Sequence, residues 1–274
     1  MVDDGKQDML LGTHTPVVEE YSPQLLYPMP RSEGRGRLGL NEPLPFAGAD
    51  LWHAYEMSWL DQTGKPVARV GRFTIGASSP NMVESKSFKL YLNSLNSTRF
   101  ISAAQASDTI KRDIGKTVGE DVALELFDPD DPSLAGAKLV GVCLDDLPVA
   151  TRGLEPDANM LRMQPEEFVE EQLYSHLLRS LCPVTGQPDW ATVWLHYRGT
   201  GIDHASLLQY IIAYRQHQEF HEQCVERIYN DIWRRCAPEL LQIQAFYTRR
   251  GGLDINPFRS NDPAARPLPR LNRQ

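Results

Sequence analysis

Apolar residues recur along this chain with two different periods, and the order of these periods constrains its fold more than any other feature. A period of two indicates a strand with one buried face, whereas a period of 3.6 indicates an amphipathic helix. A turn signal at residues 62–66 (QTGKP) separates the first two alternating runs. The first half therefore predicts, in order, strands at 51–60 and 67–76, helices at 84–96 and 103–118, and strands at 122–126 and 138–143.

The second half of the chain repeats this order. It predicts a strand at 192–198, a helix that starts near His204 with Asp203 as its N-cap, a helix at 218–236 and a strand at 241–247. We find no clear strand after Arg250 that would complete the repeat.

Residues 166–181 are ambiguous, because Leu173, Leu177 and Leu181 share one face of either a helix or a strand. By repetition of the first half, we expect a strand that pairs with residues 192–198. Two copies of one unit predict an α+β fold in which antiparallel sheets are backed by helices.

The two ends of the chain lack regular periodicity. Residues 1–47 are rich in proline and predict an extension laid along a surface. Within them, residues 34–39 (GRGRLG) match a dinucleotide-binding pattern, but no strand precedes and no helix follows, so we interpret them as a flexible basic loop. Residues 261–274 predict a frayed tail. Between the two ends we expect an N-terminal module at 48–150 and a C-terminal module at 151–260.

Charge and hydropathy narrow the class of partner. The 274 residues include 28 Lys and Arg against 36 Asp and Glu, a net charge of −8, so general binding to nucleic acid is not expected. Apolar stretches are well short of the roughly 20 residues that span a bilayer, and the first residues lack the layout of a signal peptide. We therefore expect a soluble cytoplasmic protein without a nucleic-acid or membrane partner.

Each of the four cysteines is either a buried apolar residue or a reactive thiol. They form no C-x-x-C pair, which argues against a structural zinc site, and they are too few for a disulfide framework. Cys224 lies on an apolar helix stripe, and Cys143 and Cys236 end their elements without a suggestive neighbour, so we interpret these three as packing residues. Cys182 differs because its loop, residues 180–190 (SLCPVTGQPDW), also carries Asp189.

Asp189 is close enough in sequence to turn back toward the sulfur of Cys182 as a proton donor or acceptor. An incidental thiol in a hairpin turn is the alternative, and the spacing alone leaves it open.

Two histidines and a neighbouring carboxylate form the next candidate group. His217 and His221 share a helix face, but the zinc-protease pattern needs Glu directly after the first His, where Gln218 stands, and we identify no third ligand. We therefore predict no metal site. The carboxylate of Glu222 can accept two parallel hydrogen bonds from the edge of a guanine-like ring.

Two basic segments are suited to phosphate groups. Residues 84–91 (ESKSFKLY) place Lys86 and Lys89 beside two hydroxyls at an expected helix start, where anions are favoured. Residues 247–252 (YTRRGG) add two guanidinium groups beside a flexible backbone. A solvated surface turn remains the alternative for both segments.

Together these segments resemble one family, the NADPH-dependent 7-cyano-7-deazaguanine reductases, which are the nitrile reductases of queuosine biosynthesis. The matching residues are 84–91, 182–189 (CPVTGQPD), 219–222 (EFHE) and 247–257 (YTRRGGLDINP). The resemblance covers roughly residues 30–260, in the long two-module form of the family. It implies two tandem tunnelling-fold (T-fold) modules with the active site at an interface between modules, and we expect a homodimer.

The resemblance also implies a mechanism and a set of site residues. Cys182 would attack the substrate nitrile to form a covalent thioimide, with Asp189 as proton donor, and two NADPH would supply the hydrides that carry the nitrile to a primary amine. The implied substrate-binding residues are Val83, Glu84, Ser85, His221 and Glu222. The implied cofactor-binding residues are Ser85, Lys86, Arg250 and Gly251.

Two other functions remain open from the residues alone. One is a zinc-dependent GTP cyclohydrolase-like enzyme of the same broad fold, suggested by His217, His221 and Cys182. The other is a non-catalytic purine-binding module in which Cys182 is idle.

Overall fold

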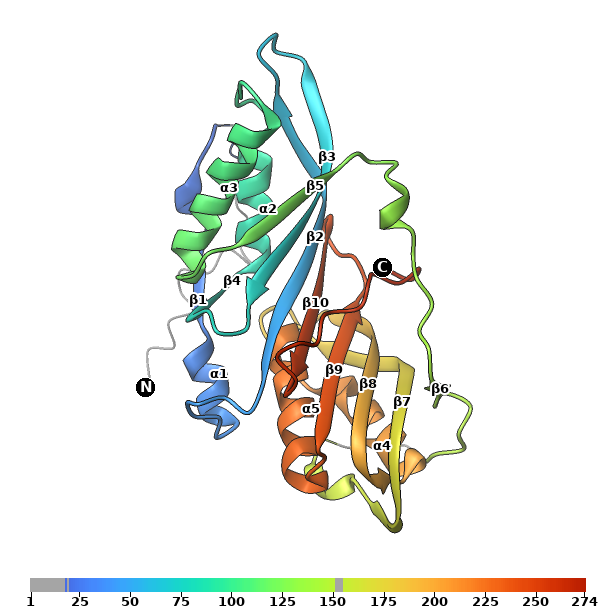
Figure 1. The fold of residues 1–274 in the computed structure, drawn as a ribbon. Helices are drawn as coiled ribbons and strands as arrows, with labels where there is room; N and C mark the ends of the chain where they lie inside the picture. Colours follow the sequence, from blue (N-terminus) through green and yellow to red (C-terminus); the bar gives the residue numbers. More distant parts are fainter. Residues whose placement is uncertain (1–17, 19, 151–154) are drawn as a thin grey trace. The chain divides into compact units, whose positions relative to one another are not determined.

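The computed structural model describes residues 18, 20–150 and 155–274, which form two compact units (Figure 1). Each unit is assembled from segments that are distant in sequence. Unit 1 takes the chain up to Ser32, Trp52–Pro132 and Arg249–Leu253, and unit 2 takes Glu33–Leu51, Ser133–Thr248 and Asp254–Gln274.

The predicted module limits at residues 47, 150 and 260 divide the chain linearly and stay a prediction. Part of the predicted extension (residues 1–17 and 19) and the start of the predicted C-terminal module (residues 151–154) lie outside the described residues.

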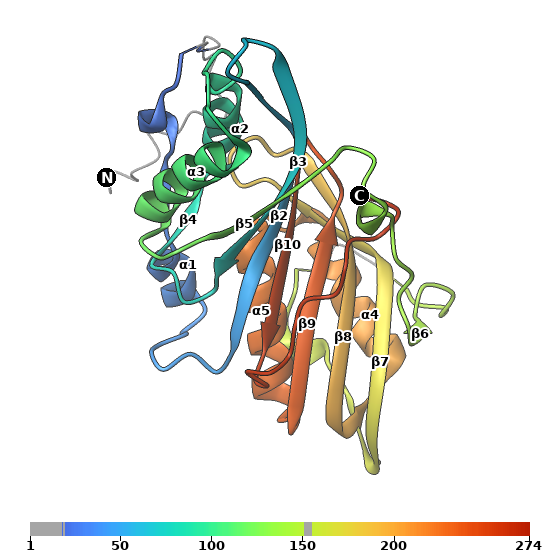
Figure 2. The same cartoon turned by 45° about the horizontal axis from the view of Figure 1, so that its top comes forward.

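Unit 1 is a sheet covered by two helices (Figure 2). Its strands follow the order β5-β3-β2, with β3 antiparallel to β5, and its helices α2 and α3 carry Phe88, Ile110 and Ile114 into the core. The ring of Phe88 contacts those of Trp52 and Phe73 at 5.4 and 5.0 Å between centroids. The elements are η1 (Pro23–Leu25), β1 (Pro28–Pro30), β2 (Ala47–Leu60, of which Trp52–Leu60 lie here), β3 (Pro66–Gly76), β4 (Asn81–Val83), α2 (Ser85–Ser94), α3 (Ala103–Val118) and β5 (Ala123–Phe127).

Unit 2 is built on the strand order β10-β9-β8-β7-β6, antiparallel except for the short β6, which is parallel to β7. One sheet face carries the paired residues Leu173, Leu195 and Ile243, which the helices α4 and α5 bury. The elements are α1 (Arg31–Arg37, mostly in this unit), η2 (Pro132–Leu134), β6 (Val142–Cys143), η3 (Ala158–Met160), β7 (Met163–Leu181), β8 (Pro188–Ile202), α4 (His204–Ala213), η4 (Tyr214–Gln216), α5 (His221–Cys236), β9 (Leu240–Tyr247) and β10 (Leu253–Ser260).

Most predicted elements are confirmed, and so is the α+β class with antiparallel sheets backed by helices. The ambiguous segment 166–181 is a strand that pairs with β8, as the repetition indicated. Asp203 caps α4 by accepting a hydrogen bond from the backbone N–H of Ser206.

One predicted strand was largely wrong, one helix begins later than predicted and one strand was missed. The expected strand at 138–143 shrinks to the two residues of β6, because this stretch is largely exposed. The helix expected from residue 218 begins at His221, because residues 217–219 pair with the end of β7 instead. A strand that we did not predict, β10, lies beside β9; its alternation is only four residues long (LDIN) and is followed by Pro257, a residue that strands disfavour.

The predicted frayed tail is in fact packed against the second face of the unit 2 sheet. Leu271 joins Trp194, Phe246 and Phe258 in one apolar cluster. The Gln244 side chain exchanges two hydrogen bonds with the backbone of Leu268, at 2.8 and 3.2 Å. The hydrophobic periodicity could not predict this packing, because the tail packs as irregular backbone and not as a helix or strand.

The predicted flexible basic loop at residues 34–39 is also wrong, since most of it belongs to helix α1. Arg35 forms a two-pronged pair with Glu226 of α5, at 2.7 and 3.0 Å. Glu226 also accepts from Arg259, which is fully buried and pairs with Asp50 at 2.8 Å. Burial alone lowers the pKa of Arg259, but Asp50 and Glu226 outweigh it, so the net pKa is raised and the side chain stays charged.

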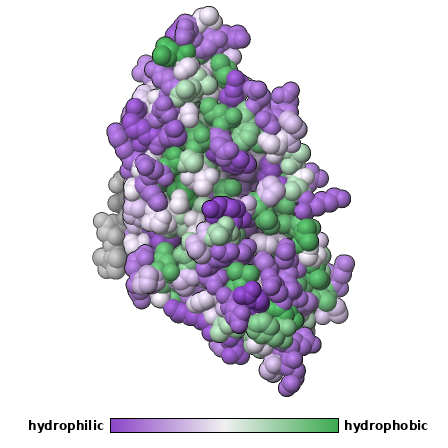
Figure 3. All heavy atoms as spheres, in the orientation of Figure 1, coloured by the Kyte–Doolittle hydropathy of each residue, from purple (hydrophilic) through white to green (hydrophobic). Residues whose placement is uncertain are grey.

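Hydrophilic and hydrophobic residues are interspersed on the face shown in Figure 3. Within the described residues, no helix is both long and apolar enough to cross a bilayer.

Candidate active site

The predicted nucleophile Cys182 lies in a tight turn between two long strands of unit 2. Leu181 at the end of β7 pairs with Pro188 at the start of β8, and Ser180 pairs with Asp189. The turn is closed by a hydrogen bond from the Cys182 N–H to the Gln187 carbonyl and one from the Gly186 N–H to the Cys182 carbonyl, both 2.9 Å. Gly186 has a φ of 68°, which glycine adopts without strain. Cys182 is 2% exposed, so a structured turn and not a mobile loop holds it.

The segment that precedes α5 is hydrogen-bonded to the end of β7. The Leu181 N–H donates to the His217 carbonyl at 2.8 Å, and the Glu219 N–H donates to the Leu181 carbonyl at 3.2 Å. This pairing brings the first turn of α5 to the hairpin that carries Cys182.

Asp189 and His221 meet at this place. The His221 Nε2 lies 3.2 Å from the Asp189 Oδ2, and the Asp189 side chain is only 7% exposed. The His221 ring stacks on Tyr247 of β9, with 3.9 Å between centroids and 24° between planes. The carboxylate of Asp189 and the imidazole of His221 therefore lie within ion-pair distance of each other in a largely buried setting.

Glu222, the predicted partner of the substrate base, is the second residue of α5 and is 5% exposed. It therefore lies in the first turn of α5, at the positive end of the helix dipole.

The two histidines that the zinc-dependent alternative would use as ligands contact different partners in the structure. His217 contacts Glu155 and Glu219 at 3.3 and 3.1 Å, whereas His221 contacts Asp189. Burial alone raises the pKa of Glu219, but hydrogen bonds from His217 and from Arg227 outweigh it, and the net pKa is lowered. Glu219 is therefore engaged as an anion with Arg227, at 2.7 and 2.9 Å.

Of the three other cysteines, which we interpreted as packing residues, two are buried and one is exposed. Cys224 and Cys236 are buried, as expected. Burial raises the pKa of Cys236 to about 11 and that of Cys224 well above its usual range, which keeps both thiols protonated and weakly nucleophilic. Cys143 is exposed and lies near Asp145 and His176, so its interpretation as a packing residue without a suggestive neighbour was wrong.

The remaining predicted site residues belong to unit 1. Val83 ends β4 and is buried, and Glu84 is the N-cap of α2. The Glu84 carboxylate accepts the N–H groups of Lys86 and Ser87 at 2.8 and 2.7 Å. Burial raises the pKa of Glu84 despite these hydrogen bonds. Ser85 and Lys86 follow in the first turn of α2 and are partly exposed.

Arg250 and Gly251 lie in the β9–β10 turn, and both are exposed. Gly251 lines a cavity of about 140 Å³ together with Lys89, Glu56 and Asn93. Lys89 pairs with Glu56 at 3.3 Å across this cavity. Gly251 has a φ of 61°, in the left-handed region that favours glycine, whereas an added Cβ would make only an ordinary van der Waals contact with Lys89 at 3.4 Å.

Two contacts of the site escaped the sequence reasoning. Tyr247 was assigned to the strand at 241–247 and to the basic motif that follows it, but its contact with His221, whose ring stacks on it, was not predicted. The available signal was its position as the last residue of the alternation over 241–247, which predicts that its side chain faces the interior. The pairing of residues 217–219 with β7 left no signal in the sequence.

Comparison with known proteins identifies the family. A family described as "Nitrile reductase, 7-cyano-7-deazaguanine-reductase N-term" matches residues 17–126, and one described as "QueF-like protein" matches residues 188–266. A solved crystal structure of the archaeosine synthase QueF-Like in the apo form aligns with a TM-score of 0.30 and 15% identity, and covers 34% of this chain and 91% of that one. That likeness is too slight to bear on fold or function.

Two curated relatives are much more similar. The NADPH-dependent 7-cyano-7-deazaguanine reductase of Coxiella burnetii (strain Dugway 5J108-111) is 54% identical over 257 residues, which are 92% of this chain and 91% of the relative. The protein of the same name from Dechloromonas aromatica (strain RCB) is 52% identical over 259 residues, 94% and 92% of the two chains. This chain therefore belongs to the NADPH-dependent 7-cyano-7-deazaguanine reductase family, as its motifs predicted.

Proposed function

We propose that this protein reduces the nitrile of 7-cyano-7-deazaguanine to the primary amine of 7-aminomethyl-7-deazaguanine with two NADPH, in queuosine biosynthesis. The observation that carries the proposal is the Cys182 hairpin, which is joined by backbone hydrogen bonds to the segment that places His221 against Asp189. The names of the curated relatives support the reaction and the cofactor.

The chemistry begins at the sulfur of Cys182. Its thiolate adds to the nitrile carbon, a C–S bond forms, and the nitrile nitrogen takes a proton to give a thioimide. Asp189 is the proposed donor, since it shares a contact with His221 and is shielded from water. A nitrile carbon is a weak electrophile, so a nucleophile and a positioned acid each lower the barrier.

Two reductions complete the reaction. NADPH supplies a hydride to the former nitrile carbon in each. After the first, the C–S bond breaks and releases the Cys182 thiolate and an imine; after the second, the nitrogen takes a further proton. The sum is one nitrile, two NADPH and two protons giving one primary amine and two NADP⁺. Covalent attachment to Cys182 until the first hydride has arrived limits loss of the intermediate.

Unit 1 fits the binding of a phosphorylated cofactor. The cavity between Lys89 and Gly251 has the size of a phosphate or ribose group, and the first turn of α2 offers Ser85 and Lys86. We propose that NADPH is held by Ser85, Lys86, Arg250 and Gly251. We also propose that the deazaguanine is held by Val83, Glu84, Ser85, His221 and Glu222.

The proposal extends to the setting of the reaction. We propose that the protein works in the cytoplasm as a homodimer on the free base, without direct contact to nucleic acid or membrane. Its net charge of −8 supports the absence of a polyanion partner. Light scattering of the full chain would contradict the dimer if it gave the mass of a monomer.

The decisive experiment is to mix the protein with 7-cyano-7-deazaguanine before NADPH is added and to record its intact mass. We expect an adduct of one substrate per chain, and we expect Cys182→Ala to lose both the adduct and NADPH oxidation, the latter by roughly 10⁴-fold or more. Cys143→Ser is the matched control, because its thiol is exposed and lies outside this site; it should retain both.

An adduct on Cys182→Ala would refute the proposed nucleophile. NADPH oxidation that never occurs with wild-type protein would favour the purine-binding module, and turnover of GTP that depends on zinc would favour the cyclohydrolase-like enzyme.

A further inference from the structure

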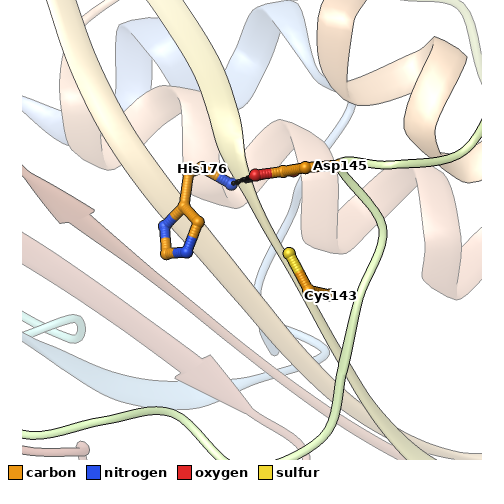
Figure 4. Close-up of side chains that lie close together, drawn as sticks. All are labelled: Cys143, Asp145 and His176. Carbon is orange, nitrogen blue, oxygen red and sulfur yellow. Dashed lines mark hydrogen bonds between the residues drawn. The ribbon is translucent and has the colours of Figure 1, made fainter.

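A second group of cysteine, aspartate and histidine lies at the edge of the unit 2 sheet, outside the site described above (Figure 4). It consists of Cys143, Asp145 and His176, and one ligand atom from each lies within 4.8 Å of the other two. The strand pairing explains the convergence. Cys143 on β6 is opposite Tyr174 on β7, so Asp145 comes level with His176 two residues further along both segments.

The carboxylate of Asp145 is held in place by the neighbouring strand. It accepts a hydrogen bond from the Ser175 hydroxyl at 2.6 Å and from the His176 backbone N–H at 3.1–3.2 Å. The carboxylate of Asp145 is thus oriented by the Ser175 hydroxyl and the His176 backbone, and not by the His176 imidazole.

The imidazole of His176 is oriented by a different residue. Its Nδ1 lies 2.8 Å from the Thr192 hydroxyl of β8. When Nδ1 donates its proton to this oxygen, Nε2 carries the free lone pair. Histidines that bind metals commonly engage their other ring nitrogen in this way, which fixes the tautomer and the direction of the ring.

We propose that Cys143, Asp145 and His176 bind one divalent metal ion of the zinc class, through the thiolate, one carboxylate oxygen and Nε2, with water in the fourth position. A soft thiolate, a borderline imidazole and a harder carboxylate are all ligands that zinc accepts in proteins. Zinc–ligand bonds are about 2.0–2.3 Å long, so the three atoms must close by roughly 1 Å. The Cys143 and His176 side chains are exposed enough to move that far.

A nucleophile assisted by a base is the alternative function for these three residue types. In such a triad the carboxylate hydrogen-bonds the imidazole and orients it. Here the carboxylate hydrogen-bonds backbone and a serine, and a threonine orients the imidazole. This arrangement favours metal binding, and the ion would tie the short strand β6 to the edge of β7.

The test is calorimetric titration of Zn²⁺ into untagged protein that has been treated with a chelator and desalted. We expect one ion per chain, with affinity lowered at least about 100-fold in Cys143→Ser and in His176→Gln. His196→Gln is the matched control, since His196 lies on the neighbouring strand β8 and contacts Glu170 instead. It should bind as the wild type does.

Cobalt provides a second readout that identifies the sulfur. With Co²⁺ in place of Zn²⁺, we expect a thiolate-to-cobalt absorption band that disappears in Cys143→Ser and persists in Cys182→Ala. Wild-type protein that binds no stoichiometric zinc, equal zinc affinity in wild type and Cys143→Ser, or a band that depends on Cys182 would each overturn the proposal. Circular dichroism of each variant confirms that it is folded.

Discussion

Unit 2 contains two groups with the same three residue types, Cys182 with Asp189 and His221, and Cys143 with Asp145 and His176. In the first, the carboxylate lies 3.2 Å from the imidazole. In the second, the carboxylate contacts the backbone N–H of the histidine, and a threonine contacts the ring. Composition is therefore the same, and the hydrogen-bond partners differ.

The hydrogen-bond partners decide which kind of chemistry each group is suited to. A carboxyl that engages an imidazole can exchange a proton with it, which suits general acid–base catalysis. A carboxylate and an imidazole that are oriented separately leave their lone pairs free to converge on one ion. Burial separates them as well, because Cys182 is 2% exposed and Cys143 is exposed to solvent.

The largest effects are expected when each of the two aspartates is replaced by asparagine. Asp189→Asn removes the proposed proton donor, and we expect NADPH oxidation to fall by about 10²–10⁴-fold while zinc affinity is retained. Asp145→Asn should lower zinc affinity by about 10–100-fold and leave NADPH oxidation unchanged. Steady-state kinetics and zinc calorimetry on both variants check this. If either variant impaired both properties, the two groups would not be independent.

The Thr192 hydroxyl provides a finer test of the second group. Thr192→Val keeps the side-chain shape and removes the partner of the His176 Nδ1. We expect about a tenfold loss of zinc affinity, because the ring is no longer held in one tautomer. Thr192→Ser retains the hydroxyl and should bind zinc almost as the wild type does. Equal loss in both variants would mean that packing of Thr192, and not its hydroxyl, matters.

The smallest effect on both groups is expected from the C-terminal tail. Leu271→Ala removes a buried side chain from the cluster with Trp194 and Phe258, and should lower the free energy of unfolding by about 2 kcal/mol. Since the protein stays folded at 25 °C, zinc affinity and NADPH oxidation should each change by less than about threefold. Chemical denaturation measures the stability. An unchanged unfolding midpoint would show that the tail contributes no packing energy.

Local pattern was enough to predict much of the fold and part of the site. The alternation over 192–198 and 241–247 shows directly which side chains face a core, because a strand turns every second residue to the same side. The proline and glycine residues around Cys182 predicted a loop, and the structure shows a tight turn there. By contrast, β10 was missed because its alternation is only four residues long (LDIN) and Pro257, a residue that strands disfavour, follows it.

Local sequence was sufficient to predict most of the strands and helices in their order, the turn that carries Cys182 and the membership of the family, because each depends on residues close together in the chain. Which distant groups meet depends on the tertiary structure. It joined Arg35 to Glu226 across 191 residues, packed Leu271 on Trp194 and brought Cys143 to His176. Periodicity records which face of an element is apolar, but it carries no information on which element will cover that face or which charge will pair there.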